Sequence, residues 1–200
     1  MPERGSQAAG GVERFRPTSG RILGVVAVLI AAAVVVIGVV DREHGSSLPV
    51  TFAALFFGIL AWAAMLRPSL WATPDELVLR NMLETVHIPL GAIEQIAVRQ
   101  VLAVSAGEQR YLCPAVGRSR KQAIQSNSPD NAAANPAESY PAFVEERIAR
   151  LAEDARAREG IALLSDEQLE LARGVRRQPA WPEIVGLAIS AVGFVVSVLV

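Results

Sequence analysis

The chain has 200 residues, of which 52% are hydrophobic and 20% charged, and its formal net charge is −1. This near-neutral balance gives no electrostatic basis for nucleic acid as a partner. Because Cys113 is the only cysteine, a disulfide or a thiolate metal cluster within one chain is excluded. The hydrophobic content exceeds that of typical soluble domains, and the excess is concentrated in three segments.

The first two apolar segments follow an N-terminal tail at residues 1–21. Residues 22–40 and 48–66 each run for 19 residues without a charge, about the length that a helix needs to cross a bilayer. Lipid offers backbone amides no partners, so both segments are expected to be helices. A cleaved signal peptide is the alternative for the first, but its apolar region is too long and a second span follows at once. Residues 22–66 therefore predict a two-helix transmembrane hairpin.

Short runs typical of β-strands occupy residues 67–113. Apolar and polar residues alternate along them, and turn residues separate them. The expected strands are residues 76–81, 85–89, 93–100, 101–105 and 109–113, with a hairpin turn at 106–108. Strands at this spacing predict a small antiparallel meander or barrel.

The composition changes again after Cys113. Residues 117–139 hold few large apolar groups, which predicts a flexible insertion. Residues 140–159 predict a helix, and a shorter helix is expected from Ser165, with Gln168 completing a capping box, to Gly174. Four residues fall on one face of the longer helix: Val144, Ile148, Leu151 and Ala155. Strands followed by helices predict an α+β fold.

A third apolar segment, residues 184–200, follows a short helix and juxtamembrane linker at 161–180. Trp181 suits a membrane interface and Pro182 suits a helix start. A buried core helix is the alternative, but the absence of charge favours a third span. No carboxylate is expected inside any span, which argues against a transporter or channel built from these helices alone.

The arginines set the expected orientation. Cytoplasmic flanks of membrane spans are enriched in Arg and Lys, and here the arginines lie before the first span, after the second and before the third. The topology determinants are Arg16, Arg21, Arg67, Arg173, Arg176 and Arg177. The expected protein is a multi-pass protein of the inner (plasma) membrane, with the N-terminus and the middle domain cytoplasmic and the C-terminus outside.

The region after the second span resembles a known family. After Arg67 and Pro68, residues 71–81 read Trp-Ala-Thr-Pro-Asp-Glu-Leu-Val-Leu-Arg-Asn, and residues 87–96 read His-Ile-Pro-Leu-Gly-Ala-Ile-Glu-Gln-Ile. This pattern resembles the bacterial pleckstrin-homology (PH-like) domains of actinobacterial membrane proteins, over residues 67–113. The resemblance implies a bent antiparallel sheet closed by a C-terminal helix, giving a PH-like domain at 67–160. Leu90 departs from the family, where an aromatic residue is common, and so does the insertion at 117–139.

The sequence offers few groups for catalysis or metal binding. His44 lies in a polar turn and His87 in a predicted strand, so each is expected to be structural or solvated. Cys113 lacks a second thiol or a matching histidine for a metal site, and no nucleophile and base are suitably spaced. The expected protein is not an enzyme and has no cofactor or metal.

The most distinctive polar feature is a basic cluster formed by Arg118, Arg120 and Lys121. Near anionic lipid each basic residue contributes on the order of 1 kcal/mol, so these three are candidates for lipid headgroup contact. The alternative is a solvated stretch of linker.

Two functions of different classes follow from the sequence. The first is a non-catalytic, membrane-anchored PH-like module or scaffold that binds protein or lipid at the inner leaflet. The second is an accessory subunit of a membrane complex, for transport or envelope assembly, in which the helices are the working part. The partners expected are the lipid bilayer, anionic headgroups and an unknown membrane or cytoplasmic protein.

Overall fold

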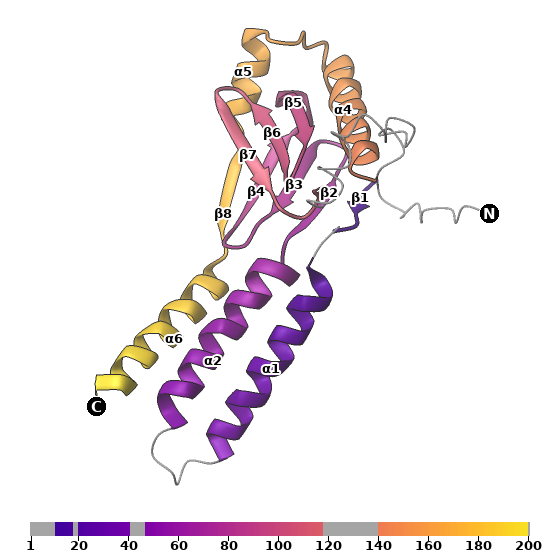
Figure 1. Cartoon of the computed structure of the whole chain (residues 1–200). Coiled ribbons are helices and arrows are strands. Elements are labelled where there is room, and N and C mark those ends of the chain that lie inside the picture. Colours follow the sequence, from indigo (N-terminus) through magenta and orange to yellow (C-terminus); the bar gives the residue numbers. More distant parts are fainter. Residues whose placement is uncertain (1–10, 18–19, 41–46, 118–139, 200) are drawn as a thin grey trace, which may run out of the picture. The chain divides into compact units, whose positions relative to one another are not determined.

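The computed structural model describes residues 11–17, 20–40, 47–117 and 140–199 (Figure 1). The chain divides into two compact units. Unit 1 comprises Met1–Ser19, Ser69–Asn81 and Thr85–Gln178, and unit 2 comprises Gly20–Pro68, Met82–Glu84 and Pro179–Val200. Each unit has its own packing and is described by itself.

A five-stranded sheet forms one layer of unit 1, in the order β1-β2-β3-β4-β8. Its strands are β1 (Glu13–Phe15), β2 (Ser69–Ala72), β3 (Glu76–Arg80), β4 (Glu84–Pro89) and β8 (Arg176–Pro179). The pairs β1–β2, β2–β3 and β3–β4 are antiparallel. The predicted strands at 76–81 and 85–89 are confirmed as β3 and β4. Strands β1, β2 and β8 were not among the predicted strands, although β2 lies within the region 67–113 where strands were expected.

A second, three-stranded antiparallel sheet has the order β5-β6-β7. Its strands are β5 (Ile93–Val98), β6 (Leu102–Ala106) and β7 (Gln109–Cys113). Gly107 and Glu108 form the turn between β6 and β7, where Gly107 has a φ of 59°. A two-residue turn with glycine first matches the twist of the strands that it joins, so the predicted hairpin is confirmed.

The predicted α+β class is confirmed, but the described strands form two sheets and no closed barrel. The break lies between β4 and β5, where a 3₁₀ turn at Leu90–Ala92 interrupts the strands. Pro89 precedes this turn and lacks the N–H that a continuing ladder would need. The sequence therefore predicted the positions of these strands, but not that they form two separate sheets.

Two helices pack on these sheets. Helix α4 (Tyr140–Glu159) has the predicted bounds and buries Val144, Ile148, Ala152 and Ala155. Three of these were expected; Leu151 is only half-buried, and Ala152 takes its place in the core. Helix α5 (Asp166–Arg173) starts as predicted, with the Ser165 hydroxyl accepting from the N–H of Gln168 at 3.3 Å. The Gln168 side chain accepts from Leu164, at 2.6 Å, rather than closing the box on Ser165.

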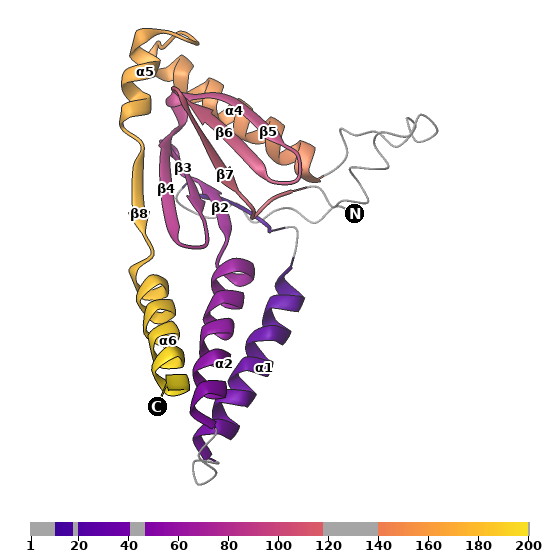
Figure 2. The same cartoon turned by 60° about the vertical axis from the view of Figure 1, so that its left-hand side comes forward.

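Three helices form unit 2 and lie side by side with α2 in the middle (Figures 1 and 2). They are α1 (Arg21–Val40), α2 (Ser47–Ala61), which continues as a π-helical turn at Trp62–Leu66, and α6 (Trp181–Leu199). All three are long and apolar enough to cross a membrane by length and composition. Helix α6 starts three residues before the predicted span, so Glu183 lies in its first turn.

Small residues allow close packing in unit 2. A Cβ added to Gly58 would lie 2.9 Å from Cβ of Ala31, so α1 and α2 approach closely there. A Cβ added to Gly193 would lie 2.4 Å from Cε1 of Phe52, a distance that side chains do not tolerate. Glycine at these two positions therefore lets α2 contact both neighbouring helices.

Candidate functional site

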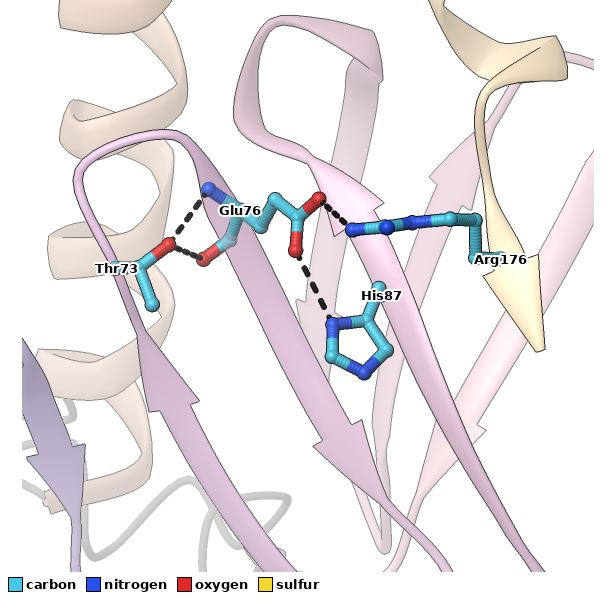
Figure 3. A network of polar contacts seen from close by, with 4 residues as sticks. All are labelled: Thr73, Glu76, His87 and Arg176. Carbon is cyan, nitrogen blue, oxygen red and sulfur yellow. Dashed lines mark hydrogen bonds and ion pairs between the residues drawn. The ribbon is translucent and has the colours of Figure 1, made fainter. Parts of the chain in front are cut away.

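A polar network crosses the outer face of the five-stranded sheet (Figure 3). Glu76 on β3 accepts from Nδ1 of His87 on β4 at 3.1 Å, and its other carboxylate oxygen pairs with Arg176 on β8. The backbone of Glu76 is held by Thr73, whose Oγ1 accepts from the Glu76 N–H at 2.9 Å and donates to its carbonyl at 3.1 Å. One carboxylate thus connects three strands at the end of the β2–β3 turn.

Two consecutive arginines attach β8 to unit 1. Because successive side chains of a strand point to opposite faces, Arg176 reaches Glu76 while Arg177 lies over the ring of Tyr111, 5.2 Å from its centroid. Arg177 also donates to Oε1 of Gln109 at 3.1 Å. Strand β8 is exposed along its length, so polar side chains rather than apolar burial hold it in place.

A cleft of about 600 Å³ lies beside Arg177. Its lining comes from the β6–β7 hairpin on one side and from α5 and β8 on the other. Its polar lining residues include Glu108, Gln109, Tyr111, Arg173 and Arg177. The size is ordinary for a binding cleft, and its lining carries the guanidinium groups of Arg173 and Arg177 and the carboxylate of Glu108.

The described residues bring together no catalytic constellation around this cleft. Cys113 is buried, and the burial, offset in part by a hydrogen bond with the backbone of Ala115, raises the pKa of its thiol to about 11. It therefore stays protonated and unreactive at neutral pH. His87 pairs with Glu76, but no serine, threonine or cysteine is hydrogen-bonded to its ring in the part of the chain that the structure describes. The same part holds no group of three His, Cys, Asp or Glu side chains that would bind a metal.

Unit 2 holds a buried ion pair at one end of its helices. Nε of Arg67, after the π-helical turn of α2, donates to Oε1 of Glu183 on α6 at 2.7 Å, and both side chains are at least nine-tenths buried. Arg67 also donates to the carbonyls of Met82 and Glu84, at 3.3 and 3.4 Å. Arg67 was predicted as a topology determinant; the structure gives it a packing role, and its topological role stays a prediction.

An apolar groove of about 550 Å³ runs along unit 2 from this ion pair. Helices α1 and α2 supply most of its walls, and Pro182 and Glu183 lie at one end. Small residues such as Ala31, Ala54 and Gly58 line it. Such a groove admits a hydrocarbon chain or a further apolar helix.

The remaining predicted residues are scattered or lie outside the described residues. The backbone N–H of Arg16 donates to the Tyr140 hydroxyl at 2.6 Å, while Arg21 is exposed at the start of α1. Arg173 pairs with Glu170 at 2.8 Å on the surface of α5. Arg118, Arg120 and Lys121 lie outside the described residues, as does His44.

Sequence reasoning missed the residues that organise both units. Glu76, Tyr111 and Glu183 were not singled out, because each acts through a partner that is distant in the chain. Glu183 carried a usable signal, since it is an acidic residue directly before a long apolar segment and such a group needs a cationic partner when buried. Glu76 carried no such signal, because exposed glutamates are common.

Comparison with known protein families, with curated proteins and with solved structures finds no match to this chain.

Proposed function

We propose that the chain is a multi-pass membrane protein whose unit 1 is a non-catalytic binding module at the cytoplasmic side of the inner membrane. Unit 1 would be a PH-like domain that binds a protein or an anionic lipid surface, held there by three spans. The proposal includes the orientation expected from the arginines, with the N-terminus inside.

The observation that carries the proposal is the contrast in exposed apolar surface between the helices of unit 2 and the core of unit 1. Large apolar side chains are exposed on all three helices: Ile22 of α1 is 84% exposed, Phe57 of α2 63% and Ile189 of α6 61%. In water such a surface is costly, whereas in a bilayer it is the expected exterior of a helix. Unit 1 instead buries most of its large aliphatic side chains in one cluster.

A binding role is supported by what surrounds the cleft of unit 1. Its described lining includes arginines and a tyrosine, residue types that are enriched at binding surfaces. The reactive groups that an enzyme would need do not converge there. The residues that line the cleft therefore favour binding of a partner over catalysis.

The membrane assignment is tested on the whole chain by cysteine labelling. In a Cys113→Ala background, single cysteines replace Ser46, in the predicted outer turn, or Glu108, exposed in unit 1. In intact cells an impermeant maleimide should label the first and not the second, and permeabilisation should restore labelling of the second. Labelling of Glu108→Cys in intact cells, or release of the chain from membranes by alkaline carbonate, would overturn the proposal.

The lipid branch is tested by hydrogen exchange of the whole chain in nanodiscs of phosphatidylcholine with and without phosphatidylserine. Contact with anionic headgroups predicts slower exchange around Arg118, Arg120 and Lys121, reversed by salt and abolished when the three become Ala. A matched control removes three exposed arginines of unit 1 elsewhere: Arg14, Arg99 and Arg150. If amide exchange around these three residues is equal in both kinds of nanodisc, the lipid branch is wrong and the partner of unit 1 is a protein.

The apolar groove favours a second function, that of an accessory subunit whose helices do the work. A helix of another membrane protein would then pack on the groove that Ala54 and Gly58 line. Since Gly58 also contacts Ala31, Ala54→Leu is the cleaner test. It should abolish co-purification of a membrane partner if this function holds, and leave it unchanged if unit 1 is the binding part.

A further inference from the structure

The two edge strands of the three-stranded sheet in unit 1, β5 and β7, differ in the hydrogen-bond partners of their outward backbone groups. At both ends of β5, outward backbone groups have side-chain partners from α4 and α5. The N–H of Val98 donates to Oε2 of Glu145 at 3.0 Å, and the carbonyl of Ile93 accepts from Nη1 of Arg156 at 2.7 Å and from Nε2 of Gln168 at 3.2 Å. These bonds occupy backbone groups at both ends of β5, so a further strand could not pair along the whole of this edge.

The β7 edge is open over most of its length. Ala106 and Gln109 flank the two-residue turn, so they form a hydrogen-bonded pair, and the alternation of an antiparallel ladder then points the backbone groups of Arg110 and Leu112 away from β6. The carbonyl of Leu112 agrees with this, since it accepts from Nδ2 of Asn81 at 2.9 Å. Among the described residues, no partner meets the N–H of Arg110, its carbonyl or the N–H of Leu112.

The exposed side chains of β7 indicate which residues a strand paired with it would carry. Arg110 and Leu112 are two residues apart, so they point to the same face, and both are exposed. Leu112 is 51% exposed although it lies in a sheet. A strand added beside β7 would therefore meet a guanidinium group and an isobutyl group in register.

We propose that β7 accepts an extended segment of another protein as an added strand, with an acidic residue opposite Arg110 and an apolar residue opposite Leu112. Main-chain hydrogen bonds would supply affinity and the two side-chain pairs specificity. Read from its own N-terminus, an antiparallel partner carries the pattern apolar-x-acidic. The inference rests on the proposed binding role of unit 1 and names its partner class.

Charge argues against a second copy of this chain as the occupant. Strand β7 reads Gln-Arg-Tyr-Leu-Cys and holds no acidic residue. Two β7 strands side by side would leave Arg110 without a carboxylate opposite it. In the register centred on Arg110, two guanidinium groups would face each other, which is unfavourable.

The experiment uses the whole chain in nanodiscs with a probe segment fused before Met1 through a Gly/Ser linker. The probe is Thr-Thr-Val-Thr-Glu-Thr-Thr, and the matched control has Lys in place of Glu. Tethering gives an effective concentration in the mM range, so weak pairing becomes measurable. Amide exchange at Arg110 and Leu112 should slow by about tenfold or more with the Glu probe, and clearly less with the Lys probe.

Two variants make the test specific to the edge and to the charge. Arg110→Glu should reverse the preference between the probes, whereas Arg99→Glu, which changes another exposed arginine of unit 1, should leave it unchanged. Arg110→Pro removes the outward N–H without removing a bond to β6, and should abolish protection of Leu112 by either probe.

The inference is overturned if neither probe protects Arg110 and Leu112, or if both protect them equally. It is also overturned if these amides are already protected without a probe and the chain is a dimer, since a second copy then covers β7. The cysteine labelling does not depend on these results. Correct labelling with no protection therefore removes the strand-addition inference alone, whereas wrong labelling removes the membrane assignment.

Discussion

Two Arg–Glu pairs, one in each unit, share their chemistry and differ in their surroundings. Arg67 and Glu183 in unit 2 are 5% and 7% exposed at the side chain, whereas Arg176 and Glu76 in unit 1 are 62% and 29% exposed. Removing one partner of a buried pair leaves an uncompensated charge away from water. Removing one partner of an exposed pair leaves a charge that water solvates, so the same deletion has a much smaller effect.

The comparison shows where each unit depends on electrostatics. In unit 2 a buried ion pair joins the end of α2 to the start of α6, and the same guanidinium group donates to the carbonyls of Met82 and Glu84. In unit 1 the apolar cluster carries the fold, and the exposed pair only positions the edge strand β8. Each of the following predictions tests this division, beginning with the largest expected effect.

Breaking the buried pair should be the most destabilising single change. Arg67→Met removes the guanidinium group and leaves Glu183 buried without its partner, which should cost about 3–5 kcal/mol of unfolding free energy. The measurement is denaturant-induced unfolding of the whole chain in detergent micelles. Replacing both partners, with Arg67→Met and Glu183→Leu, should recover most of the loss, because an apolar pair of similar volume carries no desolvation cost. A double variant as unstable as the single one would contradict this account.

The buried, neutral thiol of Cys113 should make the unfolding free energy depend on pH. Burial raises the pKa of Cys113 from 9.0 to about 11, so the unfolded chain loses this proton at lower pH than the folded chain. The stability that the buried thiol contributes is therefore complete below pH 9 and falls between pH 9 and 11, by roughly 3 kcal/mol in all.

The measurement is the unfolding free energy in detergent at pH 8 to 11, with Cys113→Ala as the comparison. The variant should be less stable at pH 8 but show a flatter decline with pH. Burial also raises the pKa of Tyr140, so both proteins should carry Tyr140→Phe. Parallel declines of the two proteins would show that the thiol does not ionise on unfolding as described.

Gln168 is a buried polar side chain without charge, and its loss should have an intermediate effect. It is fully buried, donates to the carbonyls of Gly91 and Ile93 and accepts from the N–H of Leu164. Gln168→Leu leaves these groups without that partner and should cost about 1–3 kcal/mol. Hydrogen exchange should locate the effect at residues 161–174 and at the β5 edge. An unchanged exchange pattern would mean that water replaces the amide.

The sequence predicted most elements of unit 1 because each has a local cause. The alternation of residues 85–89 around Val86 and Ile88 and the Ser165 cap are visible within a few residues, and the structure contains both. Strand β1 could not be found in this way. Its three residues include one buried side chain, Phe15, and their order depends on pairing with β2, which is 55 residues away.

The same argument applies to the site. Arg176 and Arg177 were identified from their position before an apolar segment, but their contacts with Glu76 and Tyr111 join elements that only the fold brings together. The domain that the sequence predicts spans residues 67–160. It omits β1 and with it Phe15 of the core, so the whole chain is the better material for every test proposed above.

The smallest effect is expected at the exposed pair of unit 1. Arg176→Gln removes the ion pair with Glu76 but leaves His87 hydrogen-bonded to the carboxylate, and should cost about 0–1 kcal/mol, less at high salt. Since β8 has no buried residue, the effect should appear as faster hydrogen exchange of β8 with little change in global unfolding. Glu76→Gln should have a similar effect, because it removes the negative charge that both His87 and Arg176 contact. A loss of unfolding free energy close to that of Arg67→Met would show that solvent exposure does not explain the difference between the two ion pairs. Unit 1 would then depend on β8 as strongly as unit 2 depends on Glu183.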